Sequence, residues 1–190
     1  MILAGGASRR FPPNKLLESY GGEPLFWSAV RAADAVCDTI VVVLPRNRPE
    51  PALPSAAHSI VIAHDAMLDQ GPLVGLLAGL EATRTEWALV VGGDMPRLGV
   101  ALLGAMIERA AASDADAVAL VADGRAWPMP AVLRVAAARS TVAALVRSGE
   151  RRLRACLESL RVESLGEDWW RELDGEAAWR VDVDRPADLV

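Results

Sequence analysis

The chain opens with MILAGGASRRFPPNKL (residues 1–16), where a short apolar run stops at two glycines. The first three residues predict the end of a buried strand, and Gly5 and Gly6 predict that a loop follows at once. Glycines let backbone N–H groups approach a ligand closely, and Arg10 and Lys15 bring positive charge to the same loop. A glycine-rich, basic loop directly after a strand favours the binding of phosphates.

Apolar runs and helical patterns alternate along the chain up to Asp123. Strands are predicted at residues 39–44, 59–63, 87–91 and 116–123, and helices at 24–36, 71–84 and 98–113. Each predicted strand is apolar throughout, which is typical of a parallel sheet that helices cover on both faces. The alternation therefore predicts α/β architecture with a doubly wound, mostly parallel sheet.

The chain after Asp123 has a weaker pattern. Pro128 and Pro130 argue against a central strand at residues 125–135, so we expect an edge strand or irregular structure there. Trp127 falls in this region, where packing is the favoured role and stacking on a ligand is the alternative. Two short helices are predicted at residues 137–148 and 150–160, and late strands at 161–165 and 179–184.

Composition argues against several classes of protein. The 190 residues suit a single domain, and the net charge of −5 argues against a nucleic-acid partner. No apolar run approaches the roughly 20 residues that a membrane helix needs, and no signal-peptide pattern opens the chain. We therefore expect a cytoplasmic protein with no membrane partner. Cys37 and Cys156 stand apart, and His58 and His64 have no partners at ligand spacing, which predicts neither a disulfide nor a zinc site.

Polar residues follow the predicted strands at their carboxyl ends. Besides the opening loop, they are Asn47 and Arg48, Asp65, and Asp94. Ligands in open α/β sheets bind beyond the carboxyl ends of the parallel strands, so we expect these side chains to share one edge. Asp94 lies in GGDMP (92–96), whose glycines and proline predict a tight turn. A carboxylate presented there suits Mg²⁺, which needs only one or two protein carboxylates; the alternative is that Asp94 caps the next helix.

Three motifs stand in an order and at spacings that are typical of one family. They are LAGGASRRFPPNK (3–15), QGPLVGL (70–76) following Asp65, and GGDMPRL (92–98). They resemble the L-A-G-G-x-S-x-R-[MF]-G-x-x-K signature, the G-P-L-x-G block and the C-D-M-P-x-L block of the MobA-like nucleotidyltransferases. This is the family of the molybdenum cofactor guanylyltransferases. The segments DGRAWPMPAVL, SGERRLRACL and VDVDRPADL follow in the family's order.

The resemblance implies a fold and a role for particular residues. It implies one Rossmann-like nucleotidyltransferase domain over residues 1–190, with a nucleotide-binding half at 1–98 and an acceptor-binding half at 99–190. Catalysis is implied for Arg10, Lys15 and Asp94, with Asp94 and then Asp184 as metal ligands. Nucleotide binding is implied for Leu3, Ala4, Gly5, Gly6, Lys15, Asn47, Asp65, Gly71 and Asp94. Acceptor binding is implied for Pro72, Leu73, Asp182 and Asp184.

The resemblance also implies an activity. GMP is transferred from GTP to the phosphate of a molybdopterin-type acceptor, pyrophosphate is released, and Mg²⁺ is the cofactor. The acceptor phosphate is itself the nucleophile, so the reaction needs positioning and charge neutralisation rather than covalent catalysis. Other proteins of cofactor biosynthesis are the further partners that the resemblance implies.

Departures from the family pattern leave alternatives open. Pro12 replaces a glycine, and in VDVDRPADL two aspartates, Asp182 and Asp184, replace asparagines while Arg185 replaces a threonine. Aspartate brings a negative charge that repels a phosphate unless Mg²⁺ lies between them. The alternatives are a cytidylyltransferase acting on the same cofactor, a sugar-phosphate nucleotidyltransferase, and an inactive module that binds nucleotide or pterin.

Overall fold

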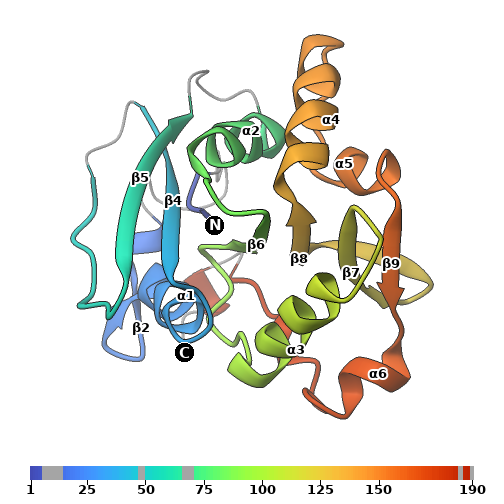
Figure 1. The fold of residues 1–190 in the computed structure, drawn as a ribbon. Coiled ribbons are helices and arrows are strands. Elements are labelled where there is room, and N and C mark those ends of the chain that lie inside the picture. Colours follow the sequence, from blue (N-terminus) through green and yellow to red (C-terminus); the bar gives the residue numbers. More distant parts are fainter. Residues whose placement is uncertain (6–14, 47–49, 66–70, 184–185, 189–190) are drawn as a thin grey trace.

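The computed structural model describes residues 1–5, 15–46, 50–65, 71–183 and 186–188. Four expected site residues, Gly6, Arg10, Asn47 and Asp184, lie outside the described residues. A seven-stranded sheet has the strand order β5-β4-β1-β6-β8-β7-β9 (Figure 1). Its strands are β1 (Ile2–Leu3), β4 (Thr39–Pro45), β5 (Ser59–Asp65), β6 (Trp87–Gly92), β7 (Ala117–Ala122), β8 (Arg125–Arg134) and β9 (Val162–Leu165). A separate small hairpin joins β2 (Ser19–Tyr20) to β3 (Glu23–Pro24).

Helices connect the strands of the main sheet. Those in the described residues are α1 (Leu25–Asp34), α2 (Pro72–Ala82), α3 (Val100–Ala111), α4 (Val135–Arg147), α5 (Arg154–Glu158) and α6 (Glu167–Arg171). Short 3₁₀ turns occur at η1 (Lys15–Leu17), η2 (Ala178–Arg180) and η3 (Pro186–Asp188). None of the helices that the structure describes has the length and apolar character needed to cross a membrane.

The sheet is mostly parallel, as the alternating pattern predicts. β1 lies between β4 and β6 and is parallel to both. β5 is parallel to β4, and β9 is parallel to β7. Only β8 runs against its neighbours, β6 and β7, among the described strands of this sheet. The expected doubly wound α/β fold in one domain is therefore confirmed.

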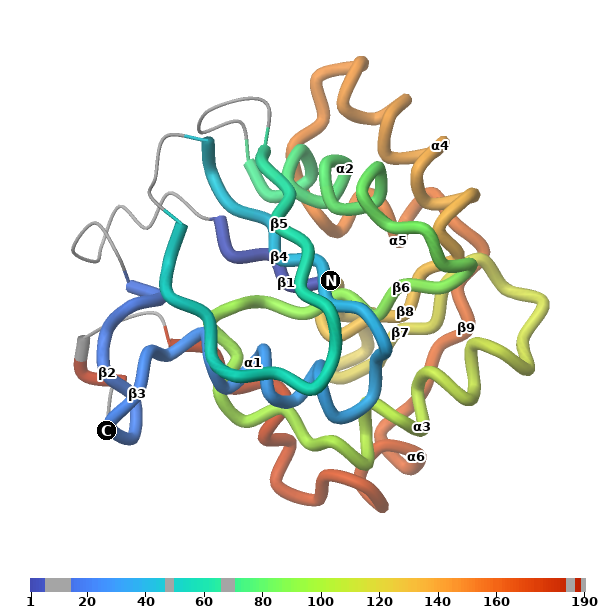
Figure 2. Tube along the Cα trace, turned by 60° about the vertical axis from the view of Figure 1, so that its left-hand side comes forward, coloured from blue at the N-terminus to red at the C-terminus, as the bar shows by residue number. Residues whose placement is uncertain are grey.

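Helices cover the sheet on both faces, with α2, α4 and α5 on one face and α1, α3 and α6 on the other (Figures 1 and 2). The side chains of β4 show why its sequence is apolar throughout. Ile40, Val42 and Leu44 belong to the core under α1 and α3, whereas Val41 and Val43 belong to the core under α2. Because successive side chains of a strand point to opposite faces, a strand between two helix layers buries every position.

The position of β8 corrects the prediction of an edge strand or irregular structure at residues 125–135. β8 is a central strand, flanked by β6 and β7. Its pairing with β6 begins only at Ala131, and its pairing with β7 is interrupted by a shift in register between Ala119 and Val121. Pro128 and Pro130 fall in this interruption, so their missing N–H groups remove no hydrogen bond from the ladder.

Two other strand predictions need correction. The apolar run at residues 59–63 predicts a buried strand, but β5 is an edge strand in which only Ala63 is buried. The strand predicted at residues 179–184 does not form in its described part, where η2 is followed by unpaired extended chain. A backbone hydrogen bond, in which Val183 N–H donates to Asp94 O at 3.0 Å, fastens this segment beside the sheet.

Candidate functional site

The carboxyl ends of β1, β4 and β6 meet at one edge of the sheet. Leu3, the last residue of β1, is opposite Val43 of β4 and Gly92 of β6. Ala4 N–H donates to Val43 O at 3.0 Å, and Gly93 N–H donates to Leu3 O at 3.0 Å. The predicted nucleotide-binding residues Leu3 and Ala4 are thus joined to the start of the GGDMP turn. The expectation of a shared edge holds for these three strands.

Lys15 and Asp94 are joined at this edge, although 79 residues separate them in the chain. Lys15 Nζ donates to Asp94 Oδ2 at 2.9 Å, and the two side chains are 10% and 29% exposed. Partial burial makes the attraction between opposite charges stronger than it would be in open water. Lys15 is also the single lysine of the sequence, a count that by itself distinguishes this residue from the many arginines.

Two glycines allow Asp94 to take this position. A Cβ on Gly92 would lie 2.6 Å from Asp94 Oδ1, and a Cβ on Gly93 would lie 3.5 Å from Ala4 Cα. Gly92 therefore leaves the space into which the carboxylate folds back. The alternative that Asp94 caps the next helix is wrong, because the N-cap of α3 is Gly99.

Asp65 lies at the same edge, at the end of β5. Its register partner is Pro45, the last residue of β4. A Cβ on Gly75 would lie 4.0 Å from Asp65 Oδ2, so the carboxylate rests against the early part of α2. Gly5 is packed from the β1 side, where an added Cβ would lie 3.4 Å from Pro45 Cγ. Asp65 and Gly5 thus flank Pro45.

The start of α2 is held by the segment around Arg151. Gly71 has a φ of +94°, which favours glycine, and a Cβ there would lie 3.0 Å from Arg151 Cβ. Pro72 begins the helix, and Leu73 N–H donates to Arg151 O at 3.3 Å. The side chain of Leu73 is fully buried in the core. Asp182, the described remainder of the predicted acceptor-binding set, lines a cavity whose described walls include neither Pro72 nor Leu73.

A cavity of about 240 Å³ lies next to Asp94, and we call it the Asp94 cavity. Its walls include Asp94 and Asp182, the arginines Arg125, Arg154 and Arg180, and the indoles of Trp127 and Trp179. Apart from the two aspartates, none of these residues was predicted as a site residue, and ligand stacking was only the alternative role of Trp127. Most of them come from β8 and from η2, two of the three regions where the strand predictions were wrong.

The carboxylate end of this cavity suits Mg²⁺. The hydrogen bond from Val183 N–H to Asp94 O places the segment that carries Asp182 beside the GGDMP turn. Mg²⁺ takes oxygen ligands and commonly uses one or two protein carboxylates, with water and phosphate oxygens completing its shell. In the described ranges, no three His, Cys, Asp or Glu side chains are grouped to hold a metal. A Mg²⁺ here would therefore take ligands from the substrate as well as from Asp94 and Asp182.

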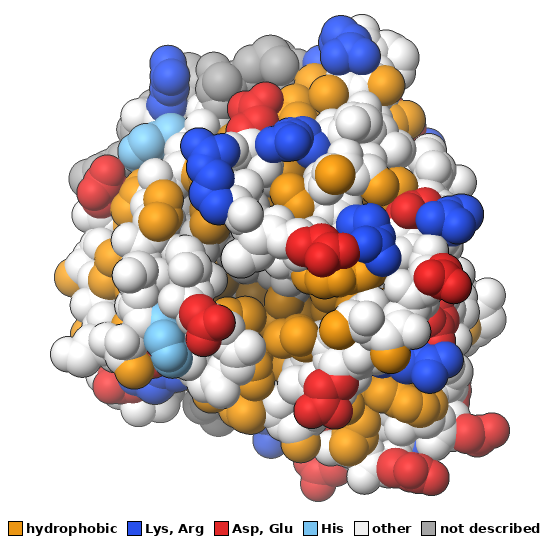
Figure 3. All heavy atoms as spheres, in the orientation of Figure 1, with side chains coloured by type: hydrophobic (Ala, Val, Ile, Leu, Met, Phe, Trp, Pro, Cys, Tyr) orange, Lys and Arg blue, Asp and Glu red, His pale blue; other side chains and the backbone are white. Residues whose placement is uncertain are grey.

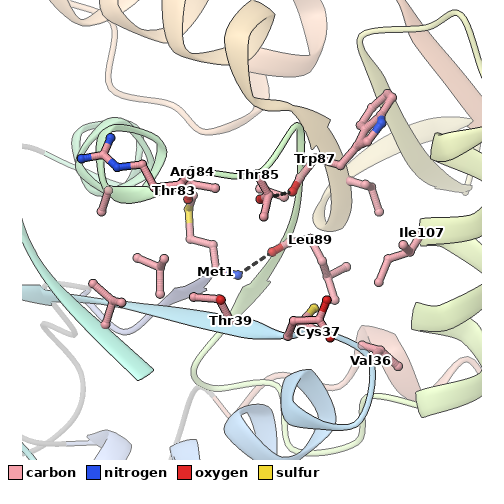
Figure 4. Close-up of a pocket in the computed structure, with 16 residues that line it drawn as sticks. Met1, Val36, Cys37, Thr39, Thr83, Arg84, Thr85, Trp87, Leu89 and Ile107 are labelled. Carbon is pink, nitrogen blue, oxygen red and sulfur yellow. Dashed lines mark hydrogen bonds between the residues drawn. The ribbon is translucent and has the colours of Figure 1, made fainter. Parts of the chain in front are cut away.

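A second cavity, of about 300 Å³, lies at the opposite end of the sheet (Figure 4). The residues that border it include Met1, Cys37, Thr39, Thr83, Thr85 and Leu89. In the orientation of Figure 1, the space-filling view in Figure 3 shows a hollow lined by apolar side chains in the middle of the molecule. The Thr83 and Thr85 hydroxyls donate to Gly79 O and Trp87 O, respectively, so their hydrogens are already used within the chain. Both cysteines are free, as expected. None of the predicted site residues that the structure describes lines this cavity.

The chain is similar to known proteins along most of its length. The family model described as the MobA-like NTP transferase domain matches residues 1–164. A probable molybdenum cofactor guanylyltransferase of Chloroflexus aggregans is 32% identical over 196 residues, which cover 100% of this chain and 90% of that protein. A protein of the same name from Synechococcus elongatus is 30% identical over 186 residues, which cover 95% of each chain.

Solved structures show the same fold. Molybdopterin-guanine dinucleotide biosynthesis protein A from Archaeoglobus fulgidus has a TM-score of 0.77 at 19% identity, covering 99% of this chain and 93% of that chain. The 2-C-methyl-D-erythritol 4-phosphate cytidylyltransferase of Thermus thermophilus has a TM-score of 0.70 at 18% identity, with the same coverage. The family model spans most of the chain, and full-length relatives share about a third of its residues. The chain therefore belongs to the MobA-like NTP transferase family, and the protein is a nucleotidyltransferase.

Proposed function

We propose that the protein transfers the GMP group of GTP to the phosphate of a molybdopterin-type acceptor and releases pyrophosphate, with Mg²⁺ as cofactor. The observation that carries the proposal is the Lys15–Asp94 pair at the carboxyl edge of the sheet, beside a cavity open to an acceptor. The acceptor class is supported by the relatives, which are named molybdenum cofactor guanylyltransferases.

The chain's own residues would supply positioning and charge. The backbone of Leu3, Ala4 and Gly5 borders the nucleotide, and the Lys15 ammonium moves from Asp94 to the triphosphate when GTP binds. Asp94 and Asp182 would hold the metal ion. Bound Mg²⁺ would add neutralisation of the charge that develops on the phosphates. Asp65 would read guanine, because a carboxylate accepts hydrogen bonds from the N1–H and amino groups of that base.

The reaction would proceed by direct displacement. An oxygen of the acceptor phosphate forms a bond to the α-phosphorus of GTP while the bond from that phosphorus to pyrophosphate breaks. The nucleophile is already anionic, so no side chain has to remove a proton. Positioning and electrostatic stabilisation are then the main contributions of the protein.

Product analysis tests the proposal. The protein is incubated with Mg²⁺, molybdopterin and each of the four NTPs separately, and the product is identified by mass spectrometry. We expect a guanine dinucleotide, and we expect Asp94→Asn to lower its rate of formation by about 100-fold, as for loss of one preorganised electrostatic contact. Folded protein that forms no product with any NTP would contradict the proposal and favour an inactive binding module.

Cytidylyl transfer to the same acceptor is the second candidate. It is favoured by Asp182 and Asp184, which stand where guanylyltransferases carry asparagines. The same four incubations separate the two candidates, because this one predicts a cytosine dinucleotide from CTP and little product from GTP.

A further inference from the structure

The wall of the Asp94 cavity carries two chemically different groups of polar side chains. Asp94 and Asp182 provide carboxylates. The remaining polar side chains of its wall are Arg125, Arg154 and Arg180 and the indoles of Trp127 and Trp179. Arginine and tryptophan side chains donate hydrogen bonds and accept none. This part of the wall therefore complements a ligand that is rich in acceptors.

Two of these arginines are available to a ligand. Arg180 is paired with Asp123, whereas neither Arg125 nor Arg154 forms a salt bridge with any residue that the structure describes. The Arg125 guanidinium lies 5.4 Å from the centre of the Trp127 ring. This cation–π contact places the guanidinium beside the Trp127 indole.

The indole nitrogens beside the cavity also lack hydrogen-bond acceptors. Trp127 Nε1 and Trp179 Nε1 are both buried, and neither donates to an acceptor among the described residues. The two rings pack edge to face with their centres 5.5 Å apart, and Trp179 is fully buried. Buried donors in native proteins nearly always have a partner, and these two indole N–H groups have none among the described residues.

The register of β8 brings two of these donors, Arg125 and Trp127, to the level of Asp94. We call the arginines and indoles of the cavity the donor wall. Ala131 of β8 is paired with Val90 of β6, and the two strands are antiparallel. The residues of β8 before Ala131 therefore run past the end of β6, to the level of the GGDMP turn. A Cβ on Gly92 would lie 3.4 Å from Met129 Cε, which confirms this approach. Trp127 and Arg125 lie two and four residues further out along the same strand.

We propose that the Asp94 cavity binds the part of the acceptor beyond its reacting phosphate, and that Arg125 and Arg154 hold a ring bearing carbonyl or anionic groups there. The inference rests on the proposed function, because the reacting phosphate must lie near Asp94. The guanine of GTP would lie toward Asp65, on the other side of β1, where a carboxylate accepts hydrogen bonds from its N1–H and amino groups.

Binding measurements on arginine variants test this assignment. Arg125→Gln, Arg154→Gln and wild-type protein are titrated with molybdopterin, and tryptophan fluorescence from Trp127 and Trp179 reports occupancy of the cavity. Each variant should weaken binding by about 10-fold to 100-fold, the range for one hydrogen bond to a charged group. GTP binding, measured by calorimetry in the presence of Mg²⁺, should stay unchanged. Arg139→Gln removes an exposed arginine on α4 and serves as the matched control.

A small alkyl phosphate separates binding of the reacting phosphate from binding of the ring. It carries the reacting group without a ring, so both arginine variants should lose less turnover with it than with molybdopterin. Unchanged molybdopterin binding in both variants, with wild-type transfer intact, would overturn the cavity assignment and leave the proposed function standing. Weakened GTP binding would overturn it in favour of a nucleotide site. Wild-type protein that binds no molybdopterin would overturn the proposed function, and this inference with it.

Discussion

At the residue scale, Lys15 and Asp94 hold each other in the place where a metal ion and a triphosphate are expected. The ammonium lies 2.9 Å from Asp94 Oδ2, so Lys15 engages this oxygen. A divalent cation that binds Asp94 must compete with the Lys15 charge. A triphosphate would draw Lys15 away and thereby release the carboxylate for the metal.

The first prediction follows from that competition. We expect Lys15→Met to lower the rate of nucleotidyl transfer by about 100-fold or more, since a preorganised positive charge is lost. In the free protein, the same variant should bind Mn²⁺ more tightly than wild type, as measured by electron paramagnetic resonance of unbound Mn²⁺. Mn²⁺ affinity that is unchanged, or lower, would show that Lys15 does not compete for Asp94. Lys15→Arg is the companion variant, because it keeps the charge but changes its geometry.

The second prediction concerns Gly92. A Cβ at this position would lie 2.6 Å from Asp94 Oδ1, the far end of a flexible side chain, so Gly92→Ala should fold but turn the carboxylate away. Misplacement by about 1 Å can cost roughly 100-fold in rate, which is the loss we expect in kcat. Gly99→Ala is the matched control, because its nearest neighbour would be 3.9 Å away. Equal activity of both variants would show that Gly92 is not needed to position the Asp94 carboxylate.

At the element scale, the segment between α4 and α5 supports the start of α2. Arg151 O accepts the Leu73 N–H, and Arg151 Nη1 donates to the carbonyl groups of Val146 and Glu150. The Glu150 carboxylate in turn accepts hydrogen bonds from the backbone N–H groups of Arg151 and Arg152. The position of α2, and with it the surface against which Asp65 rests, depends on this connection.

The third prediction tests the contact between the start of α2 and Arg151 by comparing two glycines that have similar φ values. Gly71 and Gly149 have φ values of +94° and +92°, but only Gly71 has neighbours close to an added Cβ. Both alanine variants should lose stability through backbone strain of about 1–3 kcal/mol. Gly71→Ala should lose more, because Arg151 must also move, and its GTP affinity should fall. Urea unfolding and calorimetry measure both effects; equal losses would mean that the Arg151 contact contributes little.

The fourth prediction concerns acid stability. The Arg152 guanidinium, and then the backbone N–H groups, lower the pKa of Glu150 from its ordinary value of 4.5 to about 2. A carboxyl group with a lowered folded-state pKa stabilises the fold above its ordinary pKa and loses that contribution as pH falls to the folded value. Glu150→Gln should therefore show a shallower loss of stability between pH 4.5 and pH 2, measured by urea unfolding at each pH. Glu108→Gln, an exposed change on α3, is the control and should follow wild type.

At the scale of the whole molecule, the site depends on the topology of the sheet. β1 lies in the middle, with β4 and β5 added on one side of it and β6 on the other, so the strand order reverses at this strand. A crevice at such a point is where doubly wound sheets bind ligands. The antiparallel strand β8 then extends past β6 and adds the wall of the Asp94 cavity.

The fifth prediction uses Cys156 as a reporter of the whole fold. Its side chain is buried in the core under α4 and α5, and burial raises the pKa of its thiol to about 12. In a Cys37→Ser background, labelling of Cys156 at pH 8 should therefore require opening of the structure. GTP with Mg²⁺ at 100 times its dissociation constant should slow labelling about 100-fold if the opening is global. A rate that does not respond to the nucleotide would show that α5 opens locally.

The local patterns of the sequence determined the class of the fold and much of one edge of the site. Buried strands and helices are encoded by the spacing of neighbouring apolar residues, so β1, β4, β6 and the helices α1 to α4 were predicted close to their observed positions, whereas α5 is shorter than predicted and α6 was not predicted. The signature around Gly5 and Lys15 and the GGDMP turn around Asp94 are also local. The topological rule for parallel sheets was then sufficient to place these residues at a common edge.

Only the tertiary structure decided how distant segments combine. The partners of β8 are set by hydrogen bonds to β6 and β7, and its prolines are tolerated only because of where the register shifts. The 2.9 Å contact of Lys15 with Asp94 joins residues 79 positions apart, and the Asp94 cavity combines the end of β6, the first half of β8, α5 and η2. The spacing of residues along a chain indicates which face of its own helix or strand a residue occupies. It does not indicate which residues of other elements lie opposite, and the walls of the Asp94 cavity are made of residues from several elements.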